Sequence, residues 1–139
     1  MAHIQKYYIS EVLKEVCNRM KPVTGAVFPS HRPSAVNEQM GEMIVASIPG
    51  ELDEQNAWQR GYLWIEIMVR NKAKGIADMT KLENMLNAVT ETLPIVTDRF
   101  SAINPKLILK GDDGLGFTRW MVRATLIINT TDSYNDKIG

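Results

Sequence analysis

The sequence predicts an α+β domain with two layers, in which an antiparallel-rich sheet of about four strands carries two helices on one face. Two stretches have the apolar spacing of amphipathic helices, and four stretches are rich in the aromatic and β-branched residues typical of strands. The chain has 139 residues, a length that is typical of one domain. We therefore expect a single domain over residues 1–139, with its main elements in the order α-β-β-α-β-β.

The first helix is predicted from about Ala2 to Met20, because apolar residues recur there every four positions. Residues 21–41 follow as a long loop, since three prolines and two glycines interrupt regular structure and leave only a brief strand at Val27 and Phe28. A loop of this length is uncommon in so small a domain and is usually functional or mobile.

Two strands and the second helix are predicted in the middle of the chain. The strands cover residues 43–48 and 62–70, and the polar residues 51–61 between them are typical of a turn. The helix runs from about Ala77 to Leu93, with either Asp78 or Thr80 as its N-cap, the latter through a capping box with Glu83.

A long hairpin is predicted to complete the sheet. Residues 95–104 form a connection, residues 106–110 a strand, residues 111–114 a turn, and residues 116–130 the returning strand. Residues 132–139 are polar and are predicted to be a flexible tail.

Alternation along the strands divides the predicted sheet into two faces. The core face should bury Leu63, Ile65, Ile67, Leu86, Val89, Val122 and Leu126. The second face is also apolar, so either the loop 21–41 covers it or it is a subunit interface with arginine at its edges. The predicted interface residues are Tyr62, Trp64, Met68, Phe117, Arg119, Met121 and Arg123.

Charge and composition exclude several classes of protein. Lys plus Arg and Asp plus Glu each number 16, so nothing in the net charge suggests a protein that coats nucleic acid. The single cysteine, Cys17, lies on the helix stripe and is expected to pack in the core. No apolar run approaches the roughly 20 residues that span a membrane.

No catalytic, metal-binding or cofactor-binding motif is evident. The glycine-rich stretch 111–116 lacks the features of a phosphate or calcium loop, and Asp and Gly are ordinary residues for a tight turn. One alternative is a small ligand-binding or enzymatic α+β module with a pocket under loop 21–41 that uses His31, Arg32 and Glu66. Another is a nucleic-acid binder, but Trp120 points away from Arg119 and Arg123, so the face lacks the usual platform.

The order of elements resembles the tail-terminator and tail-completion proteins of long-tailed bacteriophages and prophages. The resemblance is carried by residues 27–33 before the strand at 43–48, by residues 63–75, by the helix at 79–93 and by the hairpin at 106–129. It covers nearly the whole chain and is a likeness of pattern and length, without a diagnostic motif. The polar residues 49–61 and the region of Gln39 depart from the pattern.

The resemblance implies a structural virion protein without enzymatic activity or cofactor. Such proteins form a homo-oligomeric ring, commonly a hexamer, that caps the tail tube and joins it to the head connector. The implied partners are other copies of the chain, the tail tube protein and the connector proteins, with no membrane and no sequence-specific nucleic acid. The implied locations are the virion tail and, during assembly, the cytoplasm of the bacterial host. We expect the loop 21–41 to become ordered on assembly, with Phe28, His31 and Arg32 as its contact residues.

Overall fold

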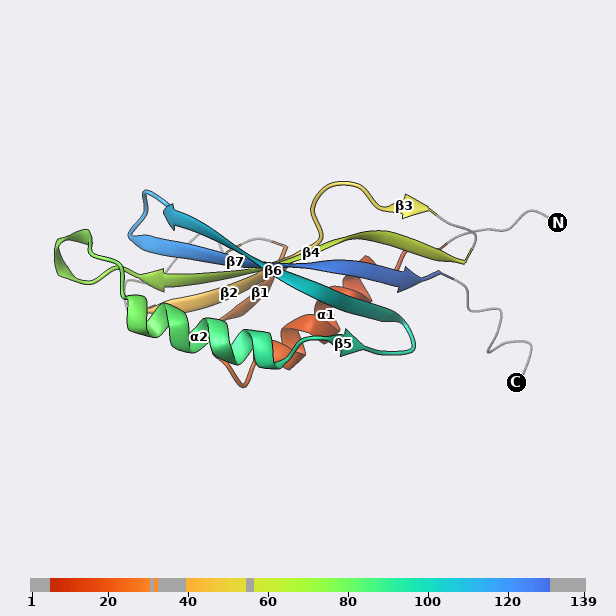
Figure 1. Cartoon of the computed structure of the whole chain (residues 1–139), viewed down its shortest axis with the longest axis horizontal. Helices are drawn as coiled ribbons and strands as arrows, with labels where there is room; N and C mark the ends of the chain where they lie inside the picture. The colour runs from red at the N-terminus through yellow and green to blue at the C-terminus, as the bar shows by residue number, and fades with distance from the viewer. Residues whose placement is uncertain (1–5, 31, 33–39, 55–56, 131–139) are drawn as a thin grey trace.

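The computed structural model describes residues 6–30, 32, 40–54 and 57–130 of the chain. These residues form two α-helices, one short 3-10 helix and seven strands (Figure 1). The helices are α1 (Ile9–Met20), η1 (Ala73–Gly75) and α2 (Met79–Glu91). The strands are β1 (Val27–Pro29), β2 (Glu42–Ser47), β3 (Asp53–Glu54), β4 (Trp58–Arg70), β5 (Ile95–Val96), β6 (Phe100–Asp112) and β7 (Phe117–Asn129).

All seven strands belong to one mixed sheet. Its order is β1-β2-β4-β7-β6-β5, and β3 pairs with β4 outside this path. Strand β1 is parallel to β2, whereas every other pair of strands is antiparallel. The prediction of about four strands in the order α-β-β-α-β-β was therefore wrong, because β1, β3 and β5 are separate short strands of the sheet.

Two segments that were predicted as turns or connections extend the sheet. Polar residues 53–54 of β3 pair with polar residues 59–60 near the start of β4, since pairing satisfies the backbone whatever the side chains are. Strand β6 begins at Phe100 and continues past Pro105, with a register shift between Ile103 and Lys106. Asn104 there has a φ of 54°, so a bulge accommodates the proline that would interrupt a regular ladder.

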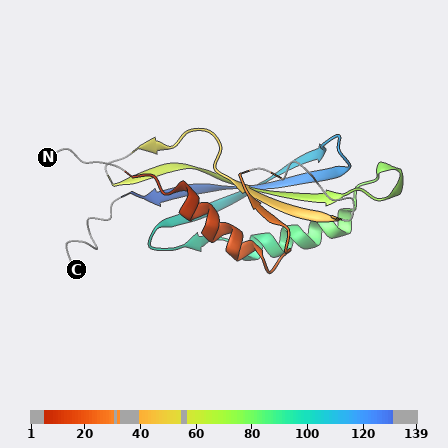
Figure 2. The same cartoon turned by 180° about the vertical axis from the view of Figure 1, so that it is seen from behind.

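Both helices pack on one side of the sheet (Figure 2). Helix α1 buries Val12, Val16 and Met20 in the core, and its start at Ile9 lies later than the predicted Ala2. Helix α2 is capped by Asp78, whose side chain accepts a hydrogen bond of 3.2 Å from the amide of Lys81. No helix in the described part of the chain is long and apolar enough to cross a membrane.

The main core lies between these helices and the sheet. Six of the seven predicted core residues are buried, and the seventh, Leu86, is half-buried against the same cluster. Cys17 is also buried here, as predicted. A second, smaller cluster lies on the opposite face of the sheet, where it consists of Met43, Val45, Met68 and Phe117.

Candidate functional site

The second face of the sheet is the candidate functional site, and strands β4 and β7 build most of it. Their antiparallel register places Trp64 opposite Arg123, Met68 opposite Arg119, and Glu66 opposite Met121. Tyr62 and Phe117 lie on the same face by alternation. The structure therefore brings together all seven predicted interface residues on one face.

One end of this face is covered by the chain itself. Met68, Phe117 and Met121 are each no more than 2% exposed. Phe28 from β1, together with Ala26 and Met40, packs against the cluster that contains Met68 and Phe117. These residues belong to the predicted loop 21–41. At this end of the face, therefore, the loop covers the sheet within the single chain, which is one of the two alternatives that the sequence left open. Met68, Phe117 and Met121 are therefore interior residues at this end of the face and do not form its exposed surface.

The other end of the face is open and combines aromatic rings with cations. Tyr62 is 44% exposed, and the guanidinium of Arg123 lies 4.8 Å from the centre of its ring. Lys110 of β6 lies over the ring of Trp64 at 5.1 Å, and its Nζ is 3.5 Å from a carboxylate oxygen of Glu66. Such cation–π contacts keep the rings and the charges at fixed positions on a solvent-facing surface.

An ion pair joins the segment after β1 to the β6–β7 turn. Arg32 donates a hydrogen bond of 2.7 Å from a guanidinium nitrogen to a carboxylate oxygen of Asp113. The other carboxylate oxygen of Asp113 accepts hydrogen bonds from the amides of Leu115 and Phe117, at 2.7 and 3.1 Å. Burial by itself raises the pKa of Asp113, but these three donors together outweigh it and hold the pKa below its ordinary value.

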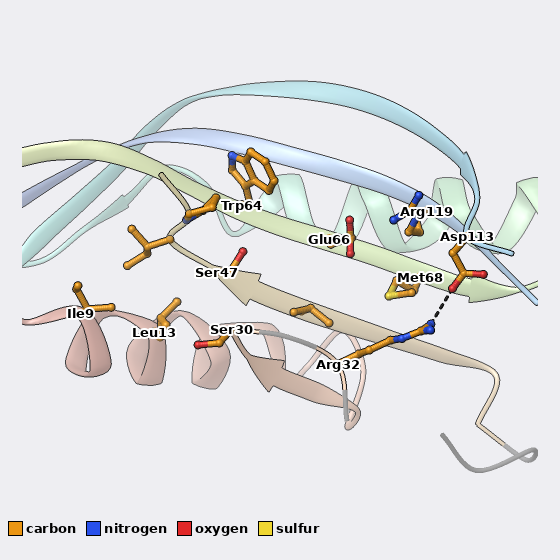
Figure 3. Close-up of a pocket in the computed structure, with 13 residues that line it drawn as sticks. Ile9, Leu13, Ser30, Arg32, Ser47, Trp64, Glu66, Met68, Asp113 and Arg119 are labelled. Atoms are coloured by element: carbon orange, nitrogen blue, oxygen red, sulfur yellow. Dashed lines mark hydrogen bonds and ion pairs between the residues drawn. The ribbon is translucent and has the colours of Figure 1, made fainter. Parts of the chain in front are cut away.

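A hollow of about 580 Å³ lies beside this ion pair on the second face (Figure 3). Its charged residues are Arg32, Glu66, Asp113 and Arg119, and its walls include Trp64 and Met68. The Nε of Arg119 is buried and has no hydrogen-bond partner among the described residues. Two cations and two carboxylates make the hollow neutral overall, and the Nε of Arg119 leaves it one donor for an oxygen of a ligand or of an incoming side chain.

This hollow contains two of the three residues that sequence reasoning assigned to a pocket, Arg32 and Glu66. The third, His31, lies outside the described residues. The role of Asp113 was missed, because a partner 81 positions away in the sequence leaves no local signal. Lys110 was missed as well, although its place on the second face follows from alternation along β6. Over the described part of the chain, no group of three or more metal-ligating side chains could hold a metal ion.

The fold is shared with a chain of a solved structure entitled "Virion of native gene transfer agent (GTA) particle". The superposition has a TM-score of 0.57 and covers 91% of this chain and 100% of that chain, with 10% sequence identity. At this identity the likeness shows a common fold. No family model and no curated protein matches the sequence.

Proposed function

We propose that this chain is a structural protein of a phage-like virion that self-associates into a ring. The observation that carries the proposal is the likeness to a virion chain of a gene transfer agent, which extends over the whole length of that chain. The finer assignment, to the tail-terminator proteins, is part of the proposal and follows from the likeness of the sequence to that group in pattern and length. In that role the ring, a hexamer, caps the tail tube and joins it to the head connector.

The proposed contact surface is the open end of the second face. Tyr62, Trp64 and Arg123 offer large rings and a guanidinium that are already held in place by cation–π contacts, so little side-chain entropy is lost on association. Aromatic residues and arginine are the types enriched where proteins associate. Arg32 is already paired with Asp113 within the chain, so a neighbouring subunit or the tail tube would add to this pair or replace it.

Light scattering and electron microscopy of the purified chain test the proposal. We expect rings and a mass several times the monomer's 15.7 kDa at tens of micromolar. The double variant Trp64→Glu with Arg123→Glu should lower the mass, whereas Lys72→Glu, which changes the exposed residue just before η1, should not. A monomeric wild type that also fails to bind purified tail tubes would refute the proposed role.

A second candidate function is small-ligand binding in the hollow next to Arg119. The observation in its favour is the buried Nε of Arg119, which a carboxylate ligand could satisfy. This hypothesis predicts a stable monomer whose melting temperature rises with small dicarboxylates, and a variant Arg119→Met in which that rise is lost. Dicarboxylates that leave the melting temperature of the wild type unchanged would exclude it.

A further inference from the structure

Strand β6 has a long open edge. On one side it pairs with β7 along its length, whereas on the other side only Ala102 and Ser101 pair, with β5. From Ile103 to Asp112, no strand among the described residues occupies that outer side. An edge of this kind presents unpaired amide and carbonyl groups and can template a further strand.

Proline, bulges and charged side chains protect an edge strand from pairing with another chain, and only part of the β6 edge has them. Pro105 with its bulge, and the register shift between Leu109 and Asp112, interrupt the ladder at the two ends of residues 106–110, whose sequence is Lys-Leu-Ile-Leu-Lys. Leu107 and Leu109 are 47% and 63% exposed on the helix side of the sheet, where neither helix covers them. This segment therefore presents two exposed leucines and the charge of Lys106, whereas the charge of Lys110 is paired with Glu66 of the same chain.

The opposite edge of the sheet carries negative charge. Strand β3 pairs with β4 on the edge that faces away from β7, so β3 and β6 lie at opposite edges of the sheet. In the right half of Figure 1, β3, β4, β7, β6 and β5 follow one another from top to bottom. Asp53 and Glu54 of β3 are exposed, as is Glu51 just before them, and no described strand pairs with the outer side of β3.

We propose that residues 106–110 of one copy add to the β3 edge of the next copy, so that the sheet continues from subunit to subunit. This inference rests on the proposed self-association and adds a contact between the two sheet edges to the proposed contact at the open end of the second face. Because the contact joins two different edges, it is heterologous, which is the kind of contact that forms a ring where the rotation between copies closes. Lys106 of one edge then meets Asp53 and Glu51 of the other, whereas Lys110 pairs with Glu66 and Glu54 accepts a hydrogen bond from Tyr7 within each chain.

The strand directions are compatible with such a contact. Strand β6 is parallel to β4, since both are antiparallel to β7, and β3 is antiparallel to β4. A continued sheet therefore brings β3 antiparallel to β6. Lys106 pairs with Arg123 of β7, which in turn pairs with Trp64 of β4. Asp53 pairs with Arg60, which lies four residues before Trp64 on β4. The copies must be staggered by at least this offset, as tilted strands in closed sheets are.

The competing arrangement pairs β6 with β6 of a second copy about a two-fold axis. In the antiparallel register centred on Ile108, Leu107 meets Leu109, but Lys106 then meets Lys110 of the other copy. Like charges directly opposite each other destabilise a strand pair. The charge pattern therefore disfavours this register of the two-fold pair.

Charge reversal on each edge, followed by mixing, distinguishes these arrangements. Lys106→Glu and Asp53→Lys should each weaken self-association about tenfold or more, because each places like charges together. An equimolar mixture of the two variants should recover the wild-type mass by light scattering, since every contact can then join opposite charges. Lys72→Glu is the matched control, and Glu51→Lys replaces Asp53→Lys if the latter melts early.

Three other results would overturn the edge contact, and they differ in what they imply for the proposed function. Rings that persist in both single variants, or a mixture that stays dissociated, would overturn the edge contact while leaving the proposed virion role intact. Stronger association of Lys106→Glu alone would overturn it in favour of the two-fold β6 pair. A wild type that is monomeric at every concentration would remove both the edge contact and the proposed self-association.

Discussion

The ion pair between Arg32 and Asp113 should stabilise the fold of the single chain. Asp113 is 5% exposed and Arg32 is 24% exposed at the side-chain level, so solvent screens the pair only in part. Asp113→Ala removes the ion pair and also the acceptor for the amides of Leu115 and Phe117, so we expect a loss of about 3–5 kcal/mol. Arg32→Ala leaves in place both hydrogen bonds that the amides of Leu115 and Phe117 donate to Asp113, so it should lower the free energy of unfolding by only about 1–2 kcal/mol.

A double-mutant cycle isolates the pair itself. The free energy of unfolding is measured by urea titration with tryptophan fluorescence, at one fixed protein concentration because association also stabilises the folded chain. The double variant should lose less than the sum of the two single losses, with a coupling of about 1–2 kcal/mol. A coupling below about 0.3 kcal/mol would show that the pair does not contribute to folding.

The pH dependence provides an independent check with a defined sign. The pKa of Asp113 is lowered in the folded chain, so its stabilising contribution is fully present above its ordinary value of 3.8 and is lost as pH falls through the lower folded pKa. The difference in unfolding free energy between the wild type and Asp113→Asn should therefore be constant from neutral pH down to about pH 5 and shrink at lower pH. If this difference in unfolding free energy instead grew as the pH was lowered, the conclusion that ionised Asp113 stabilises the folded chain would be refuted.

Three further predictions concern the interior. Ile65→Ala should lower the free energy of unfolding by about 2–5 kcal/mol in denaturant titrations, because Ile65 is fully buried in the main core; a loss under about 1 kcal/mol would contradict this burial. Gly61→Ala should lower the melting temperature, since a Cβ there would lie 2.6 Å from Cδ2 of Leu52 and 3.0 Å from the carbonyl oxygen of Glu51; an unchanged temperature would show that the 51–54 segment moves freely. Cys17 should react slowly with an aromatic disulfide reagent in the native chain and rapidly in urea, because burial raises the pKa of its thiol despite the nearby Lys21; equal rates would contradict its burial.

The sequence by itself determined the elements whose signal is local. The apolar spacing of residues 12–20 and 82–89 places both helices on the core, and alternation from Leu63 to Ile67 identifies the core face of β4. These patterns are visible without the fold, because each apolar residue must find the interior at a period set by its own backbone. The same alternation placed the seven predicted interface residues on a common face.

Only the tertiary structure decided what pairs with what and what covers the second face. Strands β3 and β5 have two residues each, and β1 has three, so their side chains carry almost no pattern. Strand β6 continues across Pro105, where the sequence pattern predicts a break, because no strand among the described residues lies on its outer side at this point and needs the missing amide. Met68 and Phe117 point away from the helices yet are buried, since residues 26–28 and 40 fold over them from a distant part of the chain. Whether an apolar residue on a sheet becomes core or surface depends on such non-local coverage, and the free energy of burial depends only on the area removed from water, not on which segment removes it.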